Sequence, residues 1–560
     1  MSESFKIHYS KTAPLSLKTL EESYHQSEED MRYDYNPFRI AQLQNYNPIY
    51  SEFFVLNEKN YGRVAFNHKY HIKNLDTVVD IESKQELSRP IFIKYSPLLD
   101  PLRFMIGKFD LSDEKTRTLP SLENQALSKL TCYNNRSYVD NFFCYLNSQL
   151  LNHHNVVNCL DYYGSFLGVQ DKYKMDIADD LEYVSESSFF KNNLGKHFFV
   201  NHDTNQDYKN YGSRGHKLKL NISSDVLNID SVALDDITIL DEPVEDVTEL
   251  VYDNVKKDKE SECASLTSSS ESSNNSELNY SSEDDDEENE DNESSWETES
   301  STNDDHSQND ERISAFINNF PIQMICLEKC EGTLDELFMK NKVNDENGSA
   351  IMMQIIMTLL LFQKCFRFTH NDLHTNNIMY VNTDKEFLYY KFENLVYKVP
   401  TYGKIFKIID FGRAIYKFQG RIFCSDSFAP GGDAATQYNC EPFFNEKKPR
   451  LEPNFSFDLA RLGTSIYDFV VNDDEEDNLD EFQKTIKRWC EDDNGKNVLY
   501  KKSGEDRYPN FKLYKMISRT VHKHTPENQL KFKYFSKYCL KSKLNSDVNV
   551  IDIDDIPVYA

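Results

Sequence analysis

Two short segments hold polar side chains whose types and spacing could handle a metal-bound phosphate. The first is THNDLHTNNIMYV (369–381) and the second is KIIDFGRA (407–414). They supply Asp372, Asn377 and Asp410, which are short oxygen ligands beside turn-forming residues and apolar strands. Mg²⁺ prefers a few hard oxygen ligands and keeps room for water and phosphate. Phosphoryl transfer also needs one carboxylate that orients the attacking hydroxyl. The pattern therefore predicts a site for metal-assisted phosphoryl transfer.

The same two segments resemble the protein kinase superfamily. HNDLHTNN aligns without a gap with the catalytic loop H-R-D-L-x-x-x-N, and IIDFGRA aligns with the D-F-G metal loop. The resemblance implies that Asp372 orients or accepts the proton of the substrate hydroxyl. It implies that Asn377 and Asp410 hold Mg²⁺, with Mn²⁺ as a substitute. His370 would pack under the loop, and Gly412 would permit the turn after the metal ligand.

Further stretches resemble the nucleotide-binding parts of that superfamily. RPIFIKY resembles the V-A-I-K strand, which implies that Lys94 contacts the α- and β-phosphates of ATP. Asp140 is the acid between positions 136 and 151, so it is the candidate partner of Lys94. MICLEKCEGTLDEL resembles the strand and hinge that hold adenine, with Leu327 as gatekeeper. Backbone groups from Glu328 to Cys330 would then bind the adenine.

FSFDLARLGTSIYDF resembles the buried central helix of the larger lobe. In that family the residue that matches Asp458 anchors the backbone of the catalytic loop, whereas the plainer interpretation is a helix N-cap. We favour the anchor because the other motifs accompany it.

The chain also departs from the family. It has no G-x-G-x-x-G, and the expected hairpin offers Gly62 alone, so a lid over the nucleotide would need other donors. Asn371 replaces the catalytic-loop Arg, which disfavours activation through a phosphorylated loop. His374 stands where Ser/Thr kinases have Lys. The A-P-E element is blurred in TQYNCEPFF, where Thr436 is a weak candidate to bridge to Asp372 and Glu441 stands at a different spacing.

Zinc is an alternative for two histidine or cysteine pairs. His370 and His374 have the spacing of a helical zinc pair, but the Asn, Asp and Thr residues around them disfavour a helix. Cys326 and Cys330 have no second pair nearby, which makes a zinc site there weak.

The elements that must position these residues follow from hydrophobic periodicity. Alternating β-branched and aromatic residues predict strands, and apolar residues three and four apart predict helices. Strands are expected within 51–66, 68–72, 77–81, 89–95, 155–166 and 320–330, and helices within 121–152, 334–340, 347–366 and from about 445 to 545.

Charge is concentrated in one segment. The 560 residues carry 63 Lys+Arg and 93 Asp+Glu, a net charge of −30. Residues 241–312 hold 26 Asp+Glu and 4 Lys+Arg, so −22 belongs to them and −8 to the rest. This balance disfavours direct nucleic-acid binding and a constitutive anchor on anionic lipid. We favour the interpretation that this acidic segment is a solvating spacer. Its negative charge would suit a basic partner. Ser282 and Ser294 within it resemble sites for acid-directed kinases.

The cysteines and the apolar runs indicate the cellular compartment in which the protein is expected. The best apolar run, 351–362, is short for a membrane span, and the first residues, MSESFKIHYS, lack the apolar stretch of a signal peptide. The 11 scattered Cys residues suggest reduced thiols in an intracellular compartment.

Together these features predict an α+β, two-lobed kinase-like fold with a long disordered acidic insertion. The expected parts are an extension (1–45), a small lobe (46–224), the insertion (225–312), the last small-lobe strand and hinge (313–330), a mainly helical lobe (331–545) and a tail (546–560).

The favoured function is a divergent Ser/Thr protein kinase that uses ATP and Mg²⁺ on a protein substrate. Two alternatives stay open: a small-molecule phosphotransferase, suggested by His374, and a pseudokinase that works as a binding module. The wording of HNDLHTNNI and GGDAATQYN resembles kinase-like proteins of large nucleocytoplasmic DNA viruses. That resemblance implies the host cytoplasm, or packaging in the virion, as the location.

Overall fold

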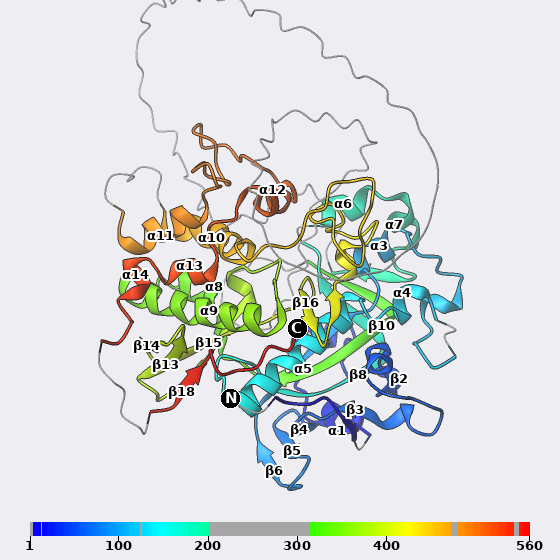
Figure 1. Cartoon of the computed structure of the whole chain (residues 1–560). Helices are drawn as coiled ribbons and strands as arrows, with labels where there is room; N and C mark the ends of the chain where they lie inside the picture. Colours follow the sequence, from blue (N-terminus) through cyan, green and yellow to red (C-terminus); the bar gives the residue numbers. More distant parts are fainter. Residues whose placement is uncertain are drawn as a thin grey trace, which may run out of the picture. The chain divides into compact units, whose positions relative to one another are not determined.

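The computed structural model describes residues 4–12, 14–123, 126–178, 180–201, 313–471, 479–541 and 548–560. The predicted acidic insertion (225–312), with Ser282 and Ser294, lies outside the described residues. The described ranges form a mixed α+β structure, with several sheets and a group of helices (Figure 1).

The strands and helices have the following bounds. The strands are β1 (Tyr9–Lys11), β2 (Ile40–Gln44), β3 (Val64–Phe66), β4 (Tyr70–Asn74), β5 (Thr77–Asp80), β6 (Glu86–Ser88), β7 (Ile91–Pro97), β8 (Tyr162–Asp176), β9 (Phe198–Val200), β10 (Ser314–Glu328), β11 (Gly332–Thr333), β12 (Ile378–Asn382), β13 (Phe387–Phe392), β14 (Leu395–Pro400), β15 (Lys404–Ile408), β16 (Ile415–Phe418), β17 (Arg421–Cys424) and β18 (Val550–Asp552). The α-helices are α1 (Leu17–Glu22), α2 (Glu28–Arg32), α3 (Pro101–Met105), α4 (Ser128–Thr131), α5 (Arg136–His154), α6 (Leu181–Glu186), α7 (Ser188–Asn193), α8 (Leu334–Met339), α9 (Asp345–Phe366), α10 (Phe457–Val470), α11 (Glu481–Trp489), α12 (Lys512–Thr520), α13 (Pro526–Gln529) and α14 (Lys533–Ser536).

An antiparallel sheet in the order β2-β8-β10-β7 carries the first candidate residues, and β9 pairs with β10 beside it. β10 is buried along most of its length because β-branched and aromatic side chains fill both of its faces. In the register of β10 and β7, Ile325 lies opposite Lys94. α5 packs against β8 and β10 (Figure 1). Asn135 caps the start of α5, and Asn155 ends it in the left-handed region at φ 56°.

The long helix α9 forms the centre of the helical group. Asn344 and Asn347 form a capping box at its start, and Arg367 ends it with φ 53°. By length and composition α9 could cross a membrane, but 94% of its apolar window is buried inside the protein, as in the core helix of a globular fold. It packs against α11, α13, β14 and β15.

Two short sheets position the loops that carry the remaining candidates. β12 lies between β11 and β15, and Ile378 of β12 faces Ile408 of β15. The pairing continues one residue further, where the Ile409 N–H donates to the carbonyl of Asn377 at 3.0 Å. The loop before β12 and the loop after β15 therefore lie side by side, which brings the two sequence motifs together.

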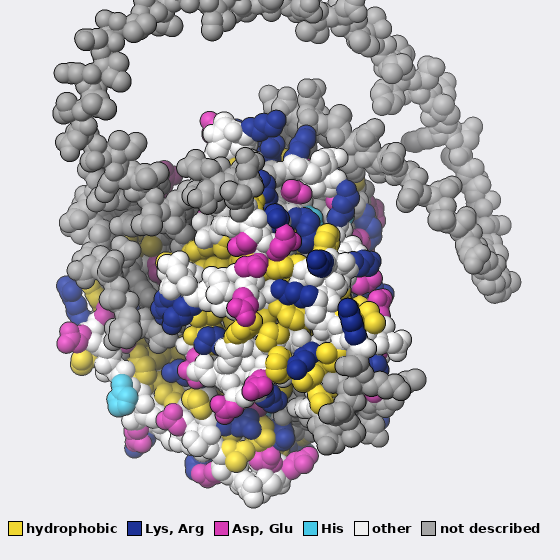
Figure 2. Space-filling model, turned by 90° about the vertical axis from the view of Figure 1, so that its left-hand side faces the viewer, with side chains coloured by type: hydrophobic (Ala, Val, Ile, Leu, Met, Phe, Trp, Pro, Cys, Tyr) yellow, Lys and Arg dark blue, Asp and Glu magenta, His cyan; other side chains and the backbone are white. Residues whose placement is uncertain are grey.

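Charged and apolar side chains are mixed on the face shown in Figure 2. Basic, acidic and hydrophobic groups are interspersed there, and the exposed large hydrophobic residues are scattered along the chain. A mixed surface of this kind is ordinary for a globular protein.

The described elements differ from the predicted strand within 51–66 and add detail to the two ends of the chain. Most of the strand expected within 51–66 is instead loop and 3₁₀ turns, Pro48–Glu52 and Tyr61–Arg63, before β3. Within the predicted extension (1–45), the described residues form β1, α1, α2 and β2, and β2 joins the main sheet. The predicted tail contains β18, which pairs in parallel with β13.

Candidate functional site

Lys94 lies at the centre of a buried ion-pair cluster. Its Nζ is 2.8 Å from Oδ2 of Asp140 and 2.9 Å from Oδ1 of Asp410. β7 provides Lys94, α5 provides Asp140, and the loop after β15 provides Asp410. The structure thus brings together three of the predicted site residues from distant parts of the chain.

Lys94 and Asp410 keep their charges at neutral pH. Burial alone lowers the pKa of Lys94, but the two carboxylates outweigh burial and raise that pKa well above its usual value. For Asp410, burial raises the pKa, and the charges of Lys94 and Arg136 overcome it, so the pKa is lowered. Lys94 is therefore a cation and Asp410 an anion, as contact with phosphate and a metal requires.

The backbone after Asp410 makes a tight turn toward α5. Asp410 itself has φ 60°, and its Oδ1 accepts the N–H of Gly412 at 3.2 Å. The N–H of Phe411 donates to Oδ1 of Asp140 at 2.9 Å. A Cβ on Gly412 would lie 3.2 Å from Oδ1 of Asp410 and 3.7 Å from Arg136, so the turn has little room for a side chain.

Asp458 holds the start of the loop that carries Asp372. It is fully buried on α10, and its two carboxylate oxygens accept the N–H groups of His370 and Asn371, each at 2.9 Å. His370 Nε2 lies 2.9 Å from the carbonyl of Ile409. The two contacts of Asp458 with the loop backbone are those expected of an anchor. Residues 370–374 are not helical, so the helical zinc pair is not formed.

Asp372 has a partner at each of its oxygens. The Tyr514 hydroxyl donates to Oδ1 at 2.7 Å, and Arg413 Nη1 lies 3.5 Å from Oδ2. Burial raises the pKa of Asp372, but the positive charges of Arg413 and its neighbours lower it well below the usual range. Asp372 is therefore a stable carboxylate, which can accept a hydrogen bond from a hydroxyl group. Thr436, the weak candidate for this contact, does not make it, since its buried Oγ1 has no hydrogen-bond partner.

Asn377 is held by its amide nitrogen. Nδ2 donates to the carbonyl of Asp372 at 2.9 Å and lies 3.0 Å from Nε2 of His374. With the nitrogen used in this way, the side-chain oxygen is the atom suited to a metal. Asn377 and Asp410 together provide the few hard oxygens that suit Mg²⁺ beside phosphate and water. Within the described ranges no group of three or more His, Cys, Asp or Glu side chains could hold a metal by itself.

A second ionic cluster adjoins Asp372 and was missed from the sequence. Asp433 lies 2.9 Å from Nη2 of Arg413 and 3.9 Å from Nη1 of Arg136. Burial raises the pKa of Asp433, but the two guanidinium groups outweigh it and lower that pKa. Arg136 is the first residue of α5, so Asp433 connects α5 to Arg413, in the loop after β15. The only signal in the sequence was the position of Arg413 directly after the D-F-G motif.

The expected hinge is tied to neighbouring segments. Leu327 is buried, and the N–H of Glu328 donates to the carbonyl of Asp161 at 3.1 Å. The Glu328 carboxylate lies 2.8 Å from Nζ of the buried Lys407. Burial raises the pKa of the Cys330 thiol to about 12, so this thiol is neutral at pH 7.

Within the described residues, Gly62 does not lie at the tip of a hairpin that could form the expected nucleotide lid. Gly62 lies in the 3₁₀ turn before β3, with open space where its Cβ would be. Among the described strands, β7 pairs only with β10.

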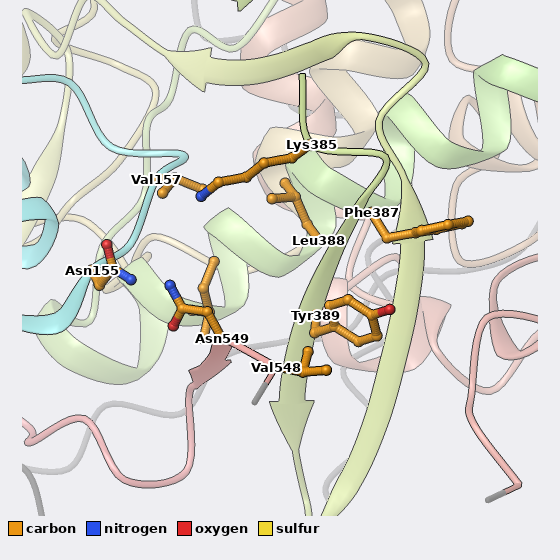
Figure 3. Close-up of a pocket in the computed structure, with 9 residues that line it drawn as sticks. Asn155, Val157, Lys385, Phe387, Leu388, Tyr389, Val548 and Asn549 are labelled. Carbon is orange, nitrogen blue, oxygen red and sulfur yellow. The ribbon is translucent and has the colours of Figure 1, made fainter. Parts of the chain in front are cut away.

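A separate cavity lies between the end of α5 and strands β13 and β18 (Figure 3). It is lined by Asn155, Val157, Lys385, Phe387, Leu388, Tyr389, Val548, Asn549 and Ile551. Figure 3 shows the Lys385 side chain extended toward Val157. None of the predicted site residues lines this cavity, so it is distinct from the clusters around Lys94 and Asp372.

Comparison with known proteins gives one partial similarity. No family model matches the chain. The chain is similar to the uncharacterized protein 098R of Invertebrate iridescent virus 6, with 30% identity over 161 residues. The match covers 28% of this chain and 24% of the viral protein, so the chain spans about a quarter of that relative. A similar protein therefore occurs in a virus, and its name assigns no activity.

Proposed function

We propose that this chain is an ATP-dependent phosphotransferase with a two-lobed, protein-kinase-like fold, and that it phosphorylates Ser or Thr hydroxyls of a protein. The observation that carries the proposal is the position of Lys94 between Asp140 and Asp410. A strand lysine held by a helix carboxylate and a metal-loop carboxylate is an arrangement that places phosphate against a metal.

In this proposal Lys94 binds the α- and β-phosphates of ATP, and Asp140 keeps its ammonium group in place. Asp410 and Asn377 would hold Mg²⁺, which neutralises charge on the transferred phosphoryl group when it is bound. Asp372 orients the acceptor hydroxyl toward the γ-phosphorus and takes up its proton late in the transfer. The backbone near Cys330, beside the buried Leu327, would hold the adenine.

Asp458 contributes through the loop backbone. It accepts both N–H groups that precede Asp372, so the direction of the loop does not depend on substrate. Preorganised loops of this kind lower the cost of reaching the reactive geometry.

A nucleotide-binding module without transfer is the second candidate. The partners on both oxygens of Asp372 favour it, since an acceptor hydroxyl must share that carboxylate with Tyr514 and Arg413. The missing partner strand of β7 among the described residues also favours it.

We further propose an infected host cell as the place of action, with the host cytoplasm or the virion as alternatives. The similarity to an iridescent-virus protein supports a viral origin. A basic protein is the partner we propose for the acidic insertion, whose charge is −22 over 241–312.

The proposal is tested by offering γ-labelled ATP with Mg²⁺ or Mn²⁺ together with a protein pool and a panel of small hydroxyl compounds. Label on Ser or Thr of protein supports a protein kinase. Label on small molecules with unlabelled protein would replace it with a small-molecule phosphotransferase. ATP binding by calorimetry without any transfer would favour the binding module.

A further inference from the structure

Tyr514 on α12 touches the predicted catalytic carboxylate directly. Its hydroxyl donates to Oδ1 of Asp372 at 2.7 Å and accepts the Nε–H of Arg461 at 2.9 Å. Tyr514 is only 4% exposed, and Arg461 is buried on α10. The hydroxyl therefore uses its one proton on Asp372 and receives another from Arg461, which fixes its direction.

The ring of Tyr514 is fixed as well. The guanidinium carbons of Arg461 and Arg413 lie 5.0 Å and 5.6 Å from the ring centroid. The ring of Phe511 stacks on it at 5.5 Å. Two of the cations that lower the pKa of Asp372 are thus packed on the same tyrosine.

We infer that Tyr514 is a positioning residue of the proposed transfer reaction, which holds the Asp372 carboxylate in one orientation. The inference rests on the proposed function. An ionised carboxylate accepts several hydrogen bonds, so a bond from Tyr514 to Oδ1 leaves capacity on Oδ2. Arg413 stands 3.5 Å from Oδ2, further than a hydrogen bond, which makes Oδ2 the oxygen for the acceptor hydroxyl.

In the opposite, inhibitory role, the Tyr514 hydroxyl would occupy the position of the acceptor hydroxyl and act as a plug that blocks its access to Asp372. The kinetic effects of Tyr514→Phe separate the two roles. A positioning residue affects kcat, because the carboxylate loses its fixed orientation. A plug affects access, so its removal raises kcat or lowers the KM for the acceptor.

Tyr500→Phe is the matched control. The Tyr500 hydroxyl also donates to an aspartate, at 2.7 and 2.8 Å from the two oxygens of Asp468, and it is buried to a similar degree. Both variants remove one tyrosine–aspartate hydrogen bond, but Tyr500 makes its bond to a carboxylate outside the site.

The experiment measures kcat and both KM values for the full-length chain and the two variants. We expect Tyr514→Phe to lower kcat about tenfold with unchanged KM values. Tyr500→Phe should leave kcat unchanged. An unchanged or raised kcat in Tyr514→Phe overturns the inference.

A second measurement does not depend on activity. The melting temperatures of Tyr514→Phe, Asp372→Asn and the double variant form a cycle. We expect the double variant to lose less than the sum of the single losses, whereas additive losses would show that the contact is absent and overturn the inference. A wild-type chain that transfers no phosphate but shows coupled losses overturns the proposed function and leaves the contact in place.

Discussion

The Nζ of Lys94 lies 2.8 Å from Oδ2 of Asp140, so a strand lysine and a helix aspartate form a buried ion pair. Asp140 also accepts the Phe411 N–H, which connects α5 to the turn after Asp410. A single carboxylate on α5 therefore holds both the proposed phosphate ligand and the proposed metal loop.

Asp140→Asn should weaken both stability and catalysis. Removing one partner of a buried ion pair costs up to roughly 3 kcal/mol, and here Asp410 still compensates part of the Lys94 charge. We expect a lower free energy of unfolding in urea and a higher KM for ATP. Asp140→Glu keeps the charge and should retain more of both quantities. Equal stability of the wild type and Asp140→Asn would contradict the role of this pair.

Asp433→Asn should loosen the loop around Asp433, which pairs with Arg136 of α5 and with Arg413 beside Asp372. The variant loses the charge that holds Arg413 and Arg136. We expect faster hydrogen exchange in peptides covering 425–440 and a fall in kcat of about tenfold. Asp433→Glu is the control that keeps the charge. Unchanged exchange in Asp433→Asn would show that the two arginines do not depend on Asp433.

Gly412→Ala should impair the metal loop with little effect on the fold. The added Cβ would lie 3.2 Å from Oδ1 of Asp410, so the carboxylate must shift by a few tenths of an ångström. We expect a higher Mg²⁺ concentration at half-maximal activity and a loss of kcat of about tenfold. Gly62→Ala is the matched control, because its Cβ meets open space. Similar metal titrations for Gly412→Ala and the wild type would contradict the placement of Asp410 at the metal.

The ion pairs around Lys94 and Asp372 predict how stability varies with pH. The pKa values of Asp372 and Asp410 are lowered in the folded chain. Their contribution is therefore complete above the unfolded-state value of about 4 and is lost as pH falls through the folded-state values. The pKa of Lys94 is raised, so its contribution is complete below about 10.4 and is lost at still higher pH.

Urea unfolding of the wild type and of Asp410→Asn at pH 7, 4 and 3 checks this dependence. The stability difference between the two chains should be largest at pH 7 and should shrink as the solution becomes acidic. A difference that is the same at pH 7 and pH 3 would contradict the lowered pKa of Asp410.

The residues that were found from the sequence belong to local motifs. Asp372, Asn377 and Asp410 stand in short runs whose order is informative by itself, and Lys94 stands in an I-F-I-K strand. Asp140 was found by elimination, because α5 carries no other acid between 136 and 151.

Tyr514, Arg461 and Asp433 could not be found in this way. Each is an ordinary residue in its own segment, and its role arises from packing between parts far apart in the chain. Tyr514 meets Asp372 only because α12 packs against α10. No local pattern encodes such a contact.

The strand expected within 51–66 failed for a related reason. Aromatic and β-branched residues favour strands, but they can also bury their side chains from turns. Phe53 packs on Phe142 of α5 at 5.1 Å, and Phe66 stacks on Tyr145 at 4.5 Å. Burial against α5 thus stabilises this segment without a strand along its whole length.

The most direct test of phosphoryl transfer compares the wild type with Asp372→Asn and Asp410→Ala, using γ-labelled ATP, Mg²⁺ and a protein pool. Asp80→Ala, at the last residue of β5 and outside the predicted site, is the control for the substitutions. We predict label on Ser or Thr with the wild type and Asp80→Ala, and its loss in the other two variants. Transfer that persists in Asp410→Ala, or no transfer by folded wild type that binds ATP, would contradict the proposed function.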